Sequence, residues 1–156
     1  MNICTPNIGE KLDLEQIKAL LETPKNIWIT THDRPDGDAM GSSLGLFHFL
    51  KQKGHQVKVV VPTEYANFLH FLPSNDEVVT YEHQKAISLQ LLDEADLVFV
   101  LDFSALHRNE MGKKIAASKA IKIMIDHHLD PDDFSHFQVW DTKASSTAEL
   151  IYEFME

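Results

Sequence analysis

Histidines and aspartates whose side chains could bind metal occur in three short groups along the chain. The groups are His32, Asp36 and Asp38 in the segment HDRPDGD, then Asp102, and then the triplet Asp126, His127 and His128. Carboxylates gathered at one place repel each other unless cations or protons intervene. Mixed histidine and aspartate ligands suit divalent ions such as Mn²⁺, Zn²⁺ or Mg²⁺. The residue types therefore predict a metal centre, provided that the fold brings the three groups together.

Each group follows directly after an apolar segment with the composition of a buried strand. These three strands are expected at residues 25–31, 97–101 and 121–125. Further strands are expected at 57–61, 78–81 and 137–140, and helices at 13–22, 43–53, 84–92, 108–118 and from 147 onward. Alternation of strands and helices, with strands apolar on both faces, predicts an α/β fold: a mostly parallel sheet flanked by helices. Because ligands bind at the carboxyl ends of such strands, the three groups should share one edge.

Three local expectations concern the ends of helices. The segment 32–38 is expected to be an extended loop that enters a helix near residues 40–43. The first helix is expected to begin at an Asp13 N-cap. The last is expected to begin at Ser146, with Glu149 completing a capping box.

Two metal ions that share a carboxylate can activate a water molecule and bind both oxygens of a phosphoryl displacement. Such a centre needs one central acid with further ligands on each side of it. Asp102 stands alone at the end of its strand, between the other two groups, and is the candidate for this shared ligand. Taken alone, the HDRPDGD segment fits a polar turn with capping aspartates equally well.

The composition limits the classes of function. The formal net charge is −10, which argues against a broad basic surface that grips nucleic acid but allows phosphate substrates if cations are present. An apolar run of about 18 residues is absent, as is a signal peptide, so no membrane partner is expected. Cys4 is the only cysteine, which excludes an internal disulfide and favours a cytoplasmic protein.

The three groups, taken in order, resemble the first three motifs of the DHH family of phosphoesterases. The longer segments RPDGDAMGSS and ASSTAELIYE, with Asp-His-His between them, most resemble its nano-RNase/pAp phosphatase subgroup. The resemblance covers nearly the whole chain. It implies a cytoplasmic hydrolase that binds two divalent ions. Mn²⁺ is the expected ion, and Mg²⁺, Zn²⁺ and Co²⁺ are the alternatives. Its substrates would be short oligoribonucleotides and 3′-phosphoadenosine 5′-phosphate (pAp), which loses its 3′-phosphate.

The resemblance also implies a role for each site residue. The ligands of one ion would be His32, Asp36 and Asp102, and those of the other Asp38, Asp102 and His127. Asp126 would orient His127. His128, catalytic together with Asp102, would contact the substrate phosphate or assist the leaving group. Arg108 would pair with phosphate or brace the site.

The chain departs from the family pattern after the third motif. A fourth motif with a further metal-binding aspartate, and a glycine-rich basic substrate-binding domain, have no counterpart in the sequence. Residues 1–156 are therefore expected to be an incomplete DHH-like N-terminal domain, with activity of its own left open. The open alternatives are a polyphosphatase, pyrophosphatase or cyclic-dinucleotide phosphodiesterase of the same family, or a non-catalytic metal- or nucleotide-binding α/β module. A homodimer of the full-length protein is also left open.

Overall fold

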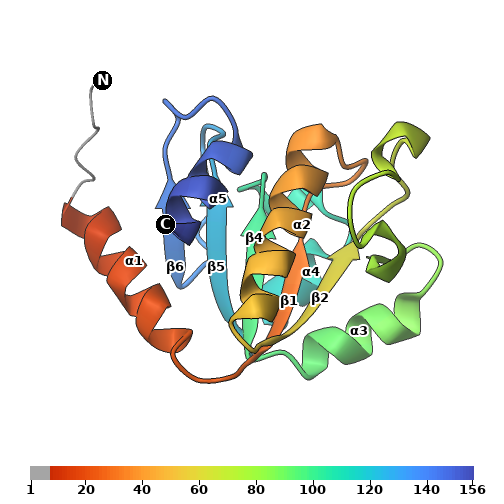
Figure 1. Cartoon of the computed structure of the whole chain (residues 1–156), viewed down its shortest axis with the longest axis horizontal. Helices are drawn as coiled ribbons and strands as arrows, with labels where there is room; N and C mark the ends of the chain where they lie inside the picture. The colour runs from red at the N-terminus through yellow and green to blue at the C-terminus, as the bar shows by residue number, and fades with distance from the viewer. Residues whose placement is uncertain (1–7) are drawn as a thin grey trace.

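The computed structural model describes residues 8–156, and Cys4 lies outside that range. Its centre is one six-stranded sheet in which every pair of neighbouring strands is parallel (Figure 1). The strands are β1 (Asn26–Thr30), β2 (Gln56–Val61), β3 (Val79–Thr80), β4 (Leu97–Leu101), β5 (Ile121–Asp126) and β6 (Phe137–Trp140). The predicted α/β fold is confirmed, with a wholly parallel sheet.

Helices cover both faces of this sheet, as Figure 1 shows for α2 and α5 in front of it and α4 behind. The α-helices are α1 (Ile8–Leu20), α2 (Gly37–Gln52), α3 (Lys85–Asp93), α4 (Gly112–Ala117) and α5 (Thr147–Met155). Three short 3-10 helices are η1 (Asn67–Leu69), η2 (Asn75–Glu77) and η3 (Leu106–Arg108). Within residues 8–156, none of the helices has the length and hydropathy needed to span a bilayer.

Strand β4 shows why both layers are needed, because all five of its residues are buried. Alternate side chains point to opposite faces of a strand. Phe99 therefore packs in the cluster formed with α1, α2 and α5, whereas Val98 and Val100 pack with Met111 and Ile115 near α4. Burying each large apolar side chain contributes about 1.5–3 kcal/mol, so β4 is held firmly in the middle of the fold.

The strand order β3-β2-β1-β4-β5-β6 places β4 directly beside β1. The chain first builds outward from β1 through β2 to β3, and then returns to build the other half of the sheet from β4 to β6. The carboxyl ends of β1, β4 and β5 are consequently neighbours, with β4 in the middle. This is the arrangement that the sequence predicted for the three groups of polar residues, and ligands of parallel sheets bind at such a point of reversal.

Two predicted helix starts are wrong. Helix α1 begins at Ile8, and Asp13 lies within it, where its carboxylate accepts a hydrogen bond from the Gln138 backbone N–H at 3.3 Å. Helix α2 begins at Gly37, because the Asp36 carboxylate accepts from the Ala39 N–H at 2.9 Å and so caps the helix. The segment 32–38 is therefore not an extended loop throughout, since its last two residues already belong to α2.

The helix predicted over 108–118 is interrupted at Asn109, which is buried and has extended backbone angles. Its side-chain amide donates to Thr30 Oγ1 at 3.0 Å and to the Thr31 carbonyl at 2.8 Å. Its side-chain oxygen accepts from the Met111 N–H at 2.7 Å. These hydrogen bonds join the segment between η3 and α4 to the end of β1, and they outweigh the local preference for a continuous helix.

His55 is a buried histidine at the amino end of β2, and it gives a prediction about how the stability of the fold depends on pH. Nδ1 of His55 accepts a hydrogen bond from the Lys25 N–H at 3.1 Å, so this nitrogen carries no proton. Burial lowers the pKa of His55, and the charge of Lys25 acts in the same direction. The unfolded chain therefore binds a proton below about pH 6.5 that the folded chain excludes. The stability contributed by neutral His55 is present above that pH and is lost as the pH falls.

We expect the His55→Asn variant, whose amide oxygen can still accept from Lys25, to lose less stability between pH 7 and pH 5.5 than the wild type. Urea denaturation at both pH values measures this difference, and other histidines contribute equally to both proteins. Equal losses in the two proteins would show that His55 is protonated in the folded state.

Candidate metal centre

The segment after β1 orients the ring of His32, which is 6% exposed. Its Nδ1 lies 2.7 Å from the Asp33 carbonyl oxygen. Because a carbonyl oxygen only accepts, this hydrogen bond places a proton on Nδ1. In a neutral ring Nε2 then keeps a free lone pair, and it points at Asp102 Oδ2, 3.2 Å away. In the neutral ring, His32 and Asp102 would together offer a pair of metal ligands, and a backbone carbonyl on the other ring nitrogen is typical of metal-binding histidines.

Asp36 and Asp38 reach the site from the beginning of α2, Asp36 as its N-cap and Asp38 from its first turn. Asp36 Oδ1 lies 3.9 Å from His32 Nε2, and the Asp36 side chain is 64% exposed. Asp38 points to the other side, where its Oδ2 lies 3.6 Å from His127 Nε2. The early start of α2 therefore separates the two carboxylates between two parts of the site.

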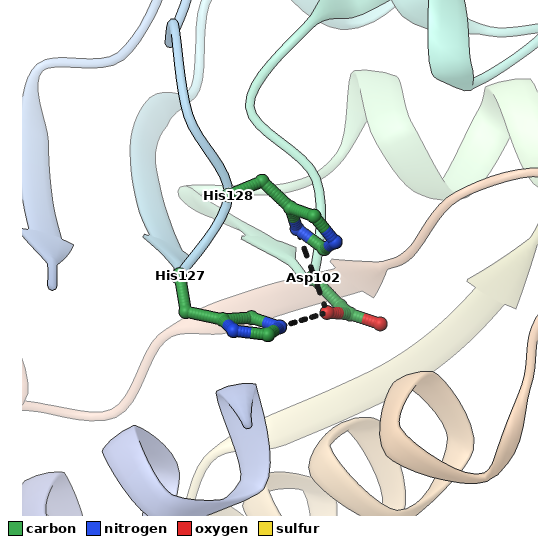
Figure 2. A group of neighbouring side chains, drawn as sticks. All are labelled: Asp102, His127 and His128. Carbon is green, nitrogen blue, oxygen red and sulfur yellow. Dashed lines mark ion pairs between the residues drawn. The ribbon is translucent and has the colours of Figure 1, made fainter. Parts of the chain in front are cut away.

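Asp102 occupies the centre of the site and is 2% exposed. Its φ of +64° is a left-handed conformation that non-glycine residues seldom adopt and that aspartate tolerates better than most. One carboxylate oxygen faces His32, whereas the other, Oδ1, lies 3.5 Å from His127 Nε2 and 3.9 Å from His128 Nδ1 (Figure 2). The strained backbone thus presents one oxygen to each side.

Asp126 contacts His128, at 2.6 Å between Oδ1 and Nδ1, and not His127 as the sequence analysis expected. The physical reason is the alternation of an extended chain, which places residues two apart on the same side. The Trp140 indole N–H fixes the backbone there by donating to the His128 carbonyl at 2.7 Å. Asp126 is fully buried, and among residues 8–156 its Oδ2 has no hydrogen-bond partner.

The electrostatics of this edge favour a cation. Burial raises the pKa of Asp102, and the charge of Asp38 raises it further, against the opposing hydrogen bonds from His32 and Thr147. Burial lowers the pKa of His32, but the hydrogen bonds to Asp102 and the Asp33 carbonyl, with the charges of Asp102 and Asp36, outweigh it and the pKa is raised. Both shifts indicate that added positive charge is favoured at this edge, and a divalent ion would supply it.

Two sets of side chains are close enough to hold a metal ion, and both contain Asp102. One set is His32, Asp36 and Asp102, and the other is Asp102, His127 and His128. The structure thus brings together all seven residues that the sequence singled out at the three strand ends. Nitrogen and carboxylate donors in this mixture fit Mn²⁺ or a similar divalent ion.

Arg108 makes no side-chain hydrogen bond or ion pair within the part of the chain that the structure describes. Its half-buried side chain lies at the end of η3, and its carbonyl accepts from the Asp33 N–H at 2.7 Å. The backbone of Arg108 therefore supports the segment after β1, while a role of its guanidinium in binding phosphate stays a prediction.

Sequence reasoning missed two residues that hold the site together, Asn109 and Thr147. Asn109 anchors the end of β1 through its hydrogen bonds to Thr30 and Thr31. Thr147 donates from its hydroxyl to Asp102 Oδ1 at 3.0 Å. From the sequence, Thr147 is expected only as the first residue of the last helix, after the Ser146 cap. The signal that could have found it is its position, since the amino end of α5 follows β6 at the same edge as the metal-binding groups.

Comparison with known protein families gives a match over residues 26–156 to the N-terminal domain of the DHH family. The chain belongs to the DHH family. The matched range contains every residue of the candidate metal centre, so the motif resemblance is confirmed at the level of the family.

Three known proteins illustrate what this DHH chain is similar to. The bifunctional oligoribonuclease and PAP phosphatase NrnA of Thermus thermophilus is 33% identical over 99% of this chain and 44% of its own length. The crystal structure of an exopolyphosphatase-related protein from Bacteroides fragilis superposes with a TM-score of 0.92 and 37% identity, covering 97% of this chain and 45% of that one. RecJ from Thermus thermophilus, solved with Mn²⁺, has a TM-score of 0.59 at 14% identity over 97% of this chain and 20% of that one.

The likeness to RecJ, at 14% identity, shows the fold alone. The DHH chain spans less than half the length of the relatives that it matches. The relatives therefore carry further segments with which these 156 residues do not align.

Proposed function

We propose that this chain is the metal-binding catalytic part of a two-metal phosphoesterase. It hydrolyses short oligoribonucleotides. From pAp it removes the 3′-phosphate. The observation that carries the proposal is the buried Asp102 carboxylate, which presents one oxygen to His32 and the other to His127. The substrate assignment is supported by the similarity to the NrnA protein of Thermus thermophilus over nearly the whole chain.

The ligand sets that we propose are His32, Asp36 and Asp102 for one ion, and Asp38, Asp102 and His127 for the other. His128 lies near the second set, but its Nδ1 already binds Asp126 at 2.6 Å. This contact removes that nitrogen from the available ligands and supports Asp38 in its place. Mn²⁺ is the preferred ion, a choice supported by the donor types and by the Mn²⁺ bound to RecJ, a protein of the same fold.

Two divalent ions held by these residues would lower the pKa of a water molecule and neutralise the charge of the phosphate. The protein supplies the rest of the chemistry. His128 is suited to give a proton to the leaving oxygen, because Asp126 holds its Nδ1 and leaves Nε2 free. Its side chain is 37% exposed, so a substrate can reach it. The carboxylate of Asp126 fixes the orientation of the ring.

Titration of the chain with Mn²⁺ by calorimetry is expected to show two ions bound per chain. Addition of pAp to the Mn²⁺-loaded protein should then release inorganic phosphate, and dinucleotides should yield mononucleotides. His128→Asn should retain both ions and lose hydrolysis by about 100-fold or more, because only the proton donor is removed.

Absence of binding at millimolar Mn²⁺ would contradict the two-metal proposal. Faster hydrolysis of pyrophosphate, polyphosphate or a cyclic dinucleotide than of pAp would leave the metal centre intact and replace the substrate assignment. These substrates are therefore assayed side by side at equal concentration.

A further inference from the structure

Thr147 is a fully buried residue that binds two acids of the site at once. Its hydroxyl donates to Asp102 Oδ1 at 3.0 Å, and its backbone N–H donates to Asp38 Oδ2 at 3.0 Å. The next residue, Ala148, adds a backbone N–H to Asp38 Oδ1 at 2.9 Å. Both oxygens of Asp38 and one oxygen of Asp102 are thereby held from a single point, the beginning of α5.

The amino end of α5 can make these contacts because the first N–H groups of a helix have no partner within the helix. Ser146 caps α5 by accepting from the Glu149 N–H at 3.1 Å, which leaves the N–H groups of Thr147 and Ala148 free for Asp38. The positive end of the helix dipole favours an ionised carboxylate at this position. Asp38 is therefore held in one orientation.

The oxygens held by α5 are those directed at the second ligand set. Asp102 Oδ1 and Asp38 Oδ2 lie 3.5 Å and 3.6 Å from the same atom, Nε2 of His127. Asp102 Oδ2, which faces His32, is not contacted by Thr147. The support from α5 is thus one-sided, because it fixes the acids of one metal position and leaves the other to the segment after β1.

We propose that Thr147 is a positioning residue for the second metal ion, and that its hydroxyl and N–H hold Asp102 and Asp38 at the angle needed to share that ion with His127. This inference rests on the proposed two-metal function. Helix α5 is anchored by Leu150, Ile151 and Phe154 in the core and packs beside α2. The docking of α5 therefore determines whether the second position is complete.

The test compares Mn²⁺ binding by the wild type with that of Thr147→Val, which keeps the shape and removes the hydroxyl. We expect one of the two ions to bind about 10- to 100-fold more weakly in calorimetry, while the other is unchanged. The electron paramagnetic resonance spectrum should change from that of an exchange-coupled Mn²⁺ pair to that of a single ion. Thr147→Ser, which restores the hydroxyl, should recover both the affinity and the coupled spectrum.

Ser146→Ala is the matched control, since it weakens the cap of α5 without touching either acid. It should lower the midpoint of thermal unfolding and leave two coupled ions. A Thr147→Val protein with two coupled ions at wild-type affinity would overturn the inference and leave the proposed function standing. The same would follow if Ser146→Ala lost the second ion equally, or if Thr147→Ser failed to recover it. A wild type that binds fewer than two ions would overturn both proposals.

Discussion

Asp102→Asn is expected to abolish the binding of a pair of Mn²⁺ ions, with the affinity for each ion reduced by at least about 100-fold. Both ligand sets contain Asp102, so this substitution acts on both metal positions at once. Asparagine is the informative replacement because it tolerates the φ of +64°, whereas alanine would add backbone strain. Its amide can donate to His32 Nε2 and its oxygen can accept from Thr147, so the site without metal should remain folded.

Calorimetry with Mn²⁺ measures this effect, and urea denaturation shows that the variant is folded. The pKa of Asp102 is raised, first by burial, so removing its charge should not lower the stability of the metal-free protein. Asp130→Asn is a matched control, because Asp130 also has a left-handed φ, of +54°, but is exposed and lies outside both ligand sets. Two ions bound normally by Asp102→Asn would contradict the shared-ligand geometry.

Gly112→Ala is expected to destabilise the fold by about 3 kcal/mol, as is typical of severe overpacking. A Cβ at this position would lie 2.2 Å from the Leu106 carbonyl oxygen and 2.9 Å from its carbon. Backbone atoms cannot rotate away as a side chain can, so η3 and α4 must separate. The displaced segment includes Asn109, which anchors the end of β1, and metal binding should weaken as well.

Gly45→Ala in α2 is the matched comparison, because the same type of substitution is expected to raise the stability there. A Cβ there meets no atom within 4 Å, and alanine is the better helix former, so we expect a stabilisation of about 0.5–1 kcal/mol. Urea denaturation of the two variants measures both effects. A Gly112→Ala protein as stable as the wild type would show that α4 does not pack against Leu106 as described.

The parallel sheet and the convergence of the three polar groups could be predicted from the sequence because both depend on strong, local signals. Each of the three groups stands directly after an apolar segment, and parallel sheets place such ends at one edge. Ser146 was predicted as the cap of the last helix for the same reason, and its side chain accepts from the Glu149 N–H.

Predictions failed where contacts between distant residues decide the local structure. Asn109 breaks a helix because Thr30, 79 residues earlier, offers a hydrogen-bond partner. The contact of Asp126 with His128 instead of His127 is a local exception, because it follows from the alternation of the extended chain after β5. The contact of Thr147 with Asp38 joins residues 109 positions apart, which no local pattern encodes.

The reversal of the sheet between β1 and β4 has a consequence for the order of events during synthesis. His32, Asp36 and Asp38 leave the ribosome long before Asp102, and neither ligand set is complete without it. If the two-metal proposal holds, neither ion can be fully held until β4 has paired with β1. From then on, bound ions stabilise by mass action. Under the two-metal proposal, metal binding is therefore expected to follow the folding of the sheet and not to start it.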